Sequence, residues 1–190
     1  MAISLSKPLL LANPMAFFVE ASYALLGSLF IALLSQVEVY LTSVPFTLQT
    51  MGLFILPLTM GRRGSCYAAL AYLAEASCGL PVLSGWHSNP LWMIGPCGGY
   101  LLAFPVAALV IGSVERQLGG KALWKSSLAL LAGVIVLFAL GLAQLSLFVG
   151  LQQAFYIGLL PFLLTEPMKM AAALSMSRLF HRAYQKEDCS

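Results

Sequence analysis

The sequence has few charged residues and few that could bind a metal or carry out catalysis. Only 9% of its 190 residues are Asp, Glu, Lys or Arg, against 60% hydrophobic residues, and it has two histidines and four cysteines. So few charged side chains cannot cover the surface of a water-soluble globule. The sequence therefore predicts an integral membrane protein with no room for a separate soluble domain.

Basic residues are also too sparse for a nucleic-acid partner, because ten Lys and Arg against seven Asp and Glu give a net charge of only +3. The cysteines show no C-x-x-C spacing, and His87 has no second histidine or paired carboxylate at ligand spacing. A glycine-rich phosphate loop ending in G-K-[ST] is missing too. We therefore expect no metal, no other cofactor and no ATP site of that kind.

Long uncharged stretches are abundant instead. A transmembrane helix needs about 20 apolar residues, and runs such as residues 129–143 do not alternate as the strands of a β-barrel would. Pro45 should interrupt a helix, and Gln144 should end one. The sequence predicts an all-α bundle of six transmembrane helices in a single domain, residues 1–190. The predicted spans cover about residues 15–36, 46–61, 65–78, 93–113, 126–144 and 154–178.

The basic residues predict which side of the membrane each loop faces. With six spans, both chain ends and the even-to-odd loops share one side, and nine of the ten Lys and Arg fall there. The positive-inside rule makes this side cytoplasmic, so the N- and C-termini are expected in the cytoplasm. The nine residues are Lys7, Arg62, Arg63, Arg116, Lys121, Lys125, Arg178, Arg182 and Lys186.

The tenth basic residue, Lys169, lies inside the sixth predicted span. Glu166 precedes it by three residues, so the two side chains share a helix face. Ionisable groups at this depth are costly and usually mark a ligand or a pathway. The pair would suit a neutral ligand with adjacent donors and an acceptor, such as a cyclic urea, an amide or a sugar. A structural ion pair, or a lysine that snorkels to the membrane surface, is the alternative.

Other candidate site residues gather at the opposite, non-cytoplasmic ends of the predicted helices. Gln49 lies at the start of the second span, and Asn89 in the loop before the fourth. Gly98 and Gly99 allow backbone or ligand to approach closely, and Tyr100 offers an aromatic face with a polar tip.

Two further patterns each have two interpretations. Trp86 and Trp92 are either interfacial anchors or walls of a pocket. In the first span, the small residues Ala24, Ser28 and Ala32 recur every four positions, which allows close helix contact. This row is either internal packing or a docking face for another subunit.

Four segments are more specific: VPFTLQTMGLFILPLTMGRRGS at 44–65, AYLAEASCGLPV at 71–82, GPCGGYLLAFPVAA at 95–108 and PFLLTEPMK at 161–169. Together they resemble the BioY family, the biotin-binding membrane subunits of energy-coupling-factor (ECF) transporters, over about residues 24–178. The last segment departs from the family motif PFLPGDxxK, since Thr165 replaces glycine, Glu166 replaces aspartate and Pro167 follows. Pro167 removes a backbone donor, and glutamate moves the carboxylate by about one methylene.

The resemblance implies an S-component that captures biotin from outside and delivers it across the bacterial cytoplasmic (inner) membrane. By position, Glu166 and Lys169 would contact the ureido group of biotin. The candidate residues at the external helix ends, Gln49, Asn89, Gly98, Gly99 and Tyr100, would line the same pocket. A transmembrane coupling subunit and two ATPases would supply energy, although some members work without them. The row of small residues in the first span is the candidate docking surface.

Two other functions stay open. The same fold could capture a different vitamin, and competition by desthiobiotin against thiamine and riboflavin would distinguish the two cases. Ser88 beside His87 raises the possibility of an intramembrane hydrolase. Neighbouring loop residues do not by themselves place an imidazole against a serine oxygen with a third orienting group, so we do not expect an enzyme.

Overall fold

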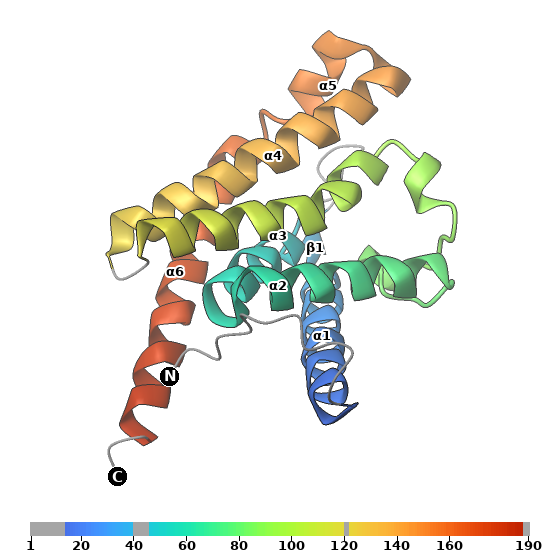
Figure 1. The fold of residues 1–190 in the computed structure, drawn as a ribbon. Helices are drawn as coiled ribbons and strands as arrows, with labels where there is room; N and C mark the ends of the chain where they lie inside the picture. The colour runs from blue at the N-terminus through green and yellow to red at the C-terminus, as the bar shows by residue number, and fades with distance from the viewer. Residues whose placement is uncertain (1–13, 40–45, 120–121, 188–190) are drawn as a thin grey trace.

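The computed structural model describes residues 14–39, 46–119 and 122–187, and these are mostly helical (Figure 1). Predictions that rest on Lys7, Val44, Pro45 and Lys121 lie outside the described residues, as do the side chains of residues 181–187. The helices are α1 (Pro14–Ser35), α2 (Gln49–Ser77), α3 (Gly98–Leu118), α4 (Leu123–Val149), α5 (Leu151–Gly158) and α6 (Phe162–Glu187), with 3-10 turns η1 (Ser84–Trp86) and η2 (Trp92–Ile94).

Three helices are long and apolar enough to cross a membrane, in the segments Phe18–Ser35, Gly98–Leu118 and Leu123–Val149. A fourth candidate span is the pair Leu151–Gly158 and Phe162–Phe180, whose axes differ by 44° across a short break. These helices have the length that an apolar bilayer core requires. The prediction of a helical integral membrane protein is confirmed at this level.

The second and third predicted spans form one element, α2, that is interrupted at Gly61. This residue has a φ of 73° and a ψ of 179°, a conformation that only glycine adopts readily. Helical geometry resumes directly after it, so the turn expected over residues 61–64 is reduced to one residue. The two halves of α2 are therefore joined without a loop.

A two-stranded antiparallel ribbon precedes α2, where the sequence predicted the start of a helix. β1 (Glu38–Val39) pairs with β2 (Phe46–Thr47), with Glu38 opposite Thr47 and Val39 opposite Phe46. The all-α prediction is confirmed by the mostly helical chain, and this ribbon is a local addition to it. Strands of two residues are too short to show any periodicity in the sequence. The ribbon brings Phe46 and Thr47 next to the first turn of α2.

The fifth predicted span ends later than expected. Gln144 does not terminate α4, which continues to Val149 and ends at Gly150 with a φ of 79°. Glutamine is a good helix former, so a single polar residue in an apolar helix is not a stop signal. Gln144 instead lies inside α4, where its side chain reaches neighbouring segments.

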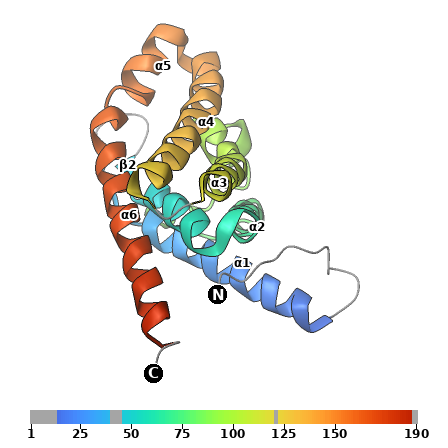
Figure 2. The ribbon, with the colours of Figure 1, turned by 60° about the vertical axis from the view of Figure 1, so that its left-hand side comes forward.

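The helices pack in chain order, α1 on α2, α2 on α3 and α3 on α4, while α6 contacts both α2 and α4. Figure 2 shows α6 along one side of the molecule, with α4, α3 and α2 beside it. Close packing of α3 and α4 depends on small residues. A Cβ atom added to Gly141 would overlap the ring of Tyr100, and one added to Gly133 would overlap Ile111. The buried space that remains lies between α6 and these helices.

Candidate ligand-binding site

A cavity of about 300 Å³ lies among the helices and the segment that joins α2 to α3. Its volume is at the lower end of the range for small-molecule sites, ~300–1,000 Å³. Most of its wall is apolar or aromatic, with a few polar side chains. The lining residues are Thr47, Gln49, Thr50, Leu83, Ser84, Asn89, Trp92, Gly95, Pro96, Cys97, Tyr100, Leu101, Phe104, Leu137, Phe138, Phe162, Glu166 and Lys169.

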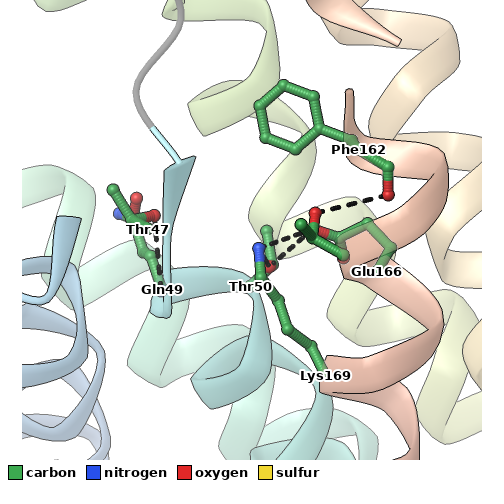
Figure 3. A network of polar contacts seen from close by, with 7 residues as sticks. Thr47, Gln49, Thr50, Phe162, Glu166 and Lys169 are labelled. Carbon is green, nitrogen blue, oxygen red and sulfur yellow. Dashed lines mark hydrogen bonds and ion pairs between the residues drawn. The ribbon is translucent and has the colours of Figure 1, made fainter. Parts of the chain in front are cut away.

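A buried ion pair from α6 is part of the lining of this cavity, and Figure 3 shows its polar contacts. Lys169 Nζ donates to Glu166 Oε1 at 2.7 Å, and the two residues are 7% and 2% exposed. Thr50, in the first turn of α2, joins the pair: its hydroxyl accepts from Lys169 Nζ at 3.0 Å and donates to Glu166 Oε1 at 3.1 Å. The spacing of three residues places both charges on one helix face, as predicted.

This network has unused hydrogen-bonding capacity. Glu166 Oε2 is buried and has no hydrogen-bond partner among the described residues. An ammonium group carries three N–H donors, and Lys169 uses two of them in the described contacts. Leaving a buried acceptor unpaired costs about 1–3 kcal/mol. A neutral ligand with an N–H group beside a carbonyl oxygen would pair with both groups.

Aromatic rings form the wall next to the ion pair. The ring of Phe162 stacks on Phe46 with centroids 4.4 Å apart, and Phe138 meets it at 5.8 Å and an angle of 60°. Tyr100 packs edge-on against Phe138 and donates its hydroxyl to the carbonyl of Gly158 at 3.0 Å. These contacts satisfy the Tyr100 hydroxyl and leave apolar surface for the body of a ligand.

Gln49 and Asn89 line the cavity at other points. The amide nitrogen of Gln49 donates to the Tyr72 hydroxyl at 2.8 Å, and that hydroxyl donates to the Val82 carbonyl at 3.1 Å. Gln49 therefore connects α2 to the loop that follows it. Asn89 is exposed, and its side-chain oxygen accepts from the backbone N–H of Leu91 at 3.1 Å.

Gly98 and Gly99 are not among the residues that line the cavity, and their role in ligand binding stays a prediction. Both are buried where α3 meets η2 and α4. A Cβ atom at Gly98 would lie 2.5 Å from the Met93 carbonyl oxygen, and one at Gly99 would lie 2.5 Å from the Leu140 carbonyl oxygen. The glycines therefore allow backbone segments to pack closely.

The structure separates the two tryptophans whose roles the sequence left open. Trp92 is 5% exposed, lines the cavity and donates its indole N–H to the Ser77 hydroxyl at 3.1 Å. Trp86 is 64% exposed and has no place in the cavity wall. Trp92 is thus a wall residue, and Trp86 lies where an interfacial anchor would be found.

The small-residue row of α1 faces α2. Ser28 is fully buried and donates its hydroxyl to Glu75 Oε1 at 2.7 Å, and Ala32 is also buried. Ala24 is half-buried. A Cβ atom on the neighbouring Gly27 would lie 2.5 Å from Ala68 of α2. These contacts show that part of the row packs against α2, while its role as a docking surface stays a prediction.

The residues that would make a hydrolase do not meet. Ser88 donates its hydroxyl to the Gly79 carbonyl at 2.5 Å, and the Nδ1 atom of His87 lies 2.8 Å from the Ser84 carbonyl. Each of the two side chains thus contacts a backbone carbonyl oxygen. This arrangement does not prepare Ser88 as a nucleophile, because no imidazole orients its hydroxyl.

Sequence reasoning missed three residues of the site: Thr50, Phe162 and Phe138. Thr50 directly follows Gln49, and Phe162 lies four residues before Glu166, which puts it on the same face of α6. Helical spacing from the ion pair could therefore have identified Phe162. Phe138 lies in a long apolar run in which nothing distinguishes one aromatic residue from its neighbours.

The fold and the cavity define a class: a helical membrane protein that can enclose a small neutral group between its helices. The model of the BioY family matches residues 11–186, and this chain belongs to that family. The probable biotin transporter BioY of Pyrococcus horikoshii is 34% identical over 158 residues, which cover 82% of this chain and 93% of the relative.

Two further relatives are similar over most of their length. The biotin transporter BioY of Thermotoga maritima is 30% identical over 138 residues, covering 72% of this chain and 80% of the relative. Biotin transporter BioY2 of Lactococcus lactis is 31% identical over 146 residues, with coverage of 76% and 80%. The names of these relatives describe transporters, in agreement with the prediction that the chain is not an enzyme.

A solved structure shares the fold. The S-component for biotin from an ECF-type ABC transporter superposes with a TM-score of 0.77 at 24% identity, covering 90% of this chain and 94% of that one. The expectation of an S-component fold is thereby confirmed.

Proposed function

We propose that this chain is the biotin-binding membrane subunit of a biotin uptake system, as its relatives' names imply. The observation that carries the proposal is the buried pair of Glu166 and Lys169 in the wall of a largely apolar cavity, with a carboxylate oxygen that has no hydrogen-bond partner among the described residues. The urea group of biotin carries an N–H on each side of a carbonyl. Its N–H would pair with Glu166 Oε2, and its carbonyl would accept from Lys169.

The rest of the molecule would fit the same cavity. The fused rings of biotin would pack against Phe162, Phe138 and Tyr100, and burial of apolar surface would stabilise the complex by about 25 cal/mol per Å². Gln49 and Asn89 would contact the ligand farther along the wall. Thr50 would hold the ion pair in position and leave its outer face free for the ligand.

We place the protein in the bacterial cytoplasmic membrane with six spans and both ends in the cytoplasm. The count of six follows if the two halves of α2 are separate spans and α5 with α6 is one broken span. The basic residues support this orientation. Uptake would be energised by a transmembrane coupling subunit and two ATPases, as the family resemblance implies.

Binding of radiolabelled biotin to the purified chain in detergent tests the proposal. Desthiobiotin should compete, while thiamine and riboflavin should not. Glu166→Ala and Lys169→Ala should abolish tight binding while the protein still elutes as a folded species, and Glu20→Ala, on α1 and away from the cavity, is the matched control. A folded parent chain that binds no biotin would overturn the function. Binding that survives both substitutions would keep biotin and overturn the site.

A further inference from the structure

One edge of the cavity is formed by the segment Trp92–Cys97, here called the strap, which leads from the loop into α3. Trp92, Gly95, Pro96 and Cys97 all line the cavity. The strap is fixed at its start, because the buried Trp92 donates its indole N–H to Ser77 of α2. Its remaining residues lie between this anchor and the first turn of α3.

A single side chain from α4 holds the middle of the strap. The amide nitrogen of Gln144 donates to the carbonyl oxygens of Met93 and Gly95, both at 2.7 Å. A side-chain amide has two N–H donors, so each carbonyl can receive one. A Cβ atom on Gly98 or Gly99 would lie 2.6–2.7 Å from atoms of Gln144. The two glycines thus make room for the glutamine side chain to reach the strap.

Another part of the cavity lining, at Leu83 and Ser84, is held by more side chains. Ser35 and Tyr72 both donate to the Val82 carbonyl, at 2.9 and 3.1 Å. Gln36 donates to the Leu83 carbonyl at 3.2 Å and accepts from the backbone N–H of Trp86 at 2.8 Å. Three side chains therefore hold that edge. Beyond Trp92, Gln144 supplies the side-chain hydrogen bonds to the strap among the described contacts. The strap also has backbone bonds, from Ile94 N–H to Leu91, from Gly95 N–H to Trp92 and from Gly98 N–H to Gly95.

We propose that Gln144 is a positioning residue that keeps the strap closed over the cavity and thereby sets the rate at which a bound ligand leaves. Opening the strap would break both of its hydrogen bonds: the Met93 carbonyl would lose the amide donor, and the Gly95 carbonyl would keep only the backbone N–H of Gly98 at 3.0 Å. Removing the donor should therefore accelerate dissociation by about tenfold, because two hydrogen bonds are lost together. Mutations within a binding interface generally change the dissociation rate more than the association rate.

Two variants separate hydrogen bonding from packing. Gln144→Met retains most of the volume without a donor, and Gln144→Glu has the same shape but presents a carboxylate that repels both carbonyl oxygens. Gln153→Met and Gln153→Glu are matched controls, because Gln153 is exposed on α5 and lines no part of the cavity. The first measurement is the dissociation rate of radiolabelled biotin from the full chain in detergent. This measurement rests on the proposed function.

The second measurement needs no ligand: the rate at which a maleimide labels Cys97 after Cys66, Cys78 and Cys189 are replaced by alanine. Cys97 is half-buried and lines the cavity, so its labelling should be slow while the strap is closed. Both Gln144 variants should speed labelling, with Gln144→Glu the faster, while the Gln153 controls leave it unchanged.

The outcomes are distinct. If Gln144 acts only by filling space, Gln144→Glu will behave like the parent in both assays, and the proposal is overturned. Unchanged labelling in both Gln144 variants overturns it as well. If the parent binds no biotin, the proposed function fails, yet the labelling rates still decide whether Gln144 holds the strap.

Discussion

The Glu166–Lys169 pair can be tested by exchanging each charge for a neutral residue of similar size. Glu166→Gln leaves Lys169 as a buried cation without a counter-charge, and Lys169→Met leaves Glu166 as a buried anion. Removing one partner of a buried pair typically costs 3–5 kcal/mol of stability, about 10 °C in melting temperature for a chain of this size. The double variant Glu166→Gln/Lys169→Met buries no net charge, and its melting temperature should return close to that of the parent.

Ligand affinity should follow a different pattern. Each single variant and the double variant removes at least one charged side chain that we propose binds the ligand. Each should therefore weaken biotin binding by about 10- to 100-fold. Thermal unfolding in detergent and equilibrium binding measure the two quantities, and Lys125→Met serves as the control for a lysine outside the cavity. A double variant that recovers affinity together with stability would refute our reasoning, because the pair would then be purely structural.

Three further predictions use other parts of the structure. Thr50→Val should weaken biotin binding by about tenfold, because valine keeps the shape of threonine but lacks the hydroxyl that contacts both Glu166 and Lys169. Unchanged affinity would show that Thr50 does not orient the pair. Gly141→Ala should destabilise the protein by about 1–3 kcal/mol, because the ring of Tyr100 fills the space that the new Cβ atom would need. Gly61→Ala should cost about 1 kcal/mol through its backbone conformation alone, since nothing lies within 4 Å of the new Cβ atom. Equal melting temperatures for the parent and Gly141→Ala would contradict this packing. Biotin amide should bind within a few-fold of biotin, because Lys169 is the only cation among the described lining residues and is already paired with Glu166. A loss of affinity of a hundredfold or more in a competition assay would mean that the carboxylate of biotin, and not its urea group, contacts Lys169.

The sequence predicted those features that depend on composition and on helical spacing. Low charge and long apolar runs predicted membrane helices, and the spacing of three residues between Glu166 and Lys169 predicted a pair on one face. Both results come from regularities that a single segment contains. The same kind of reasoning would have extended to Phe162, which is one turn away from Glu166.

The features that the sequence did not predict depend on contacts between distant segments. Gln144 was interpreted as the end of a helix, although it continues α4 and binds backbone carbonyls of the strap. Gly98 and Gly99 were expected to line the ligand pocket, and their contacts with neighbouring backbone and the Gln144 side chain were not predicted. Ser28 was expected to serve either packing or docking, and its hydrogen bond to Glu75 was not predicted. In each case the residue type was informative, but its partner could be identified only in three dimensions.

The mutual neutralisation of Glu166 and Lys169 has a bioenergetic consequence. They are the only charged residues among the described residues that line the cavity, and their charges cancel. The occupied site therefore has the net charge of its ligand. A ligand that retains an ionised carboxylate would therefore cross the bilayer as a net anion. Against an inside-negative membrane potential, inward movement of one negative charge costs about 2.3 kcal/mol per 100 mV. The membrane voltage would thus oppose accumulation of such a ligand, and the voltage dependence of uptake would report the charge that moves with it.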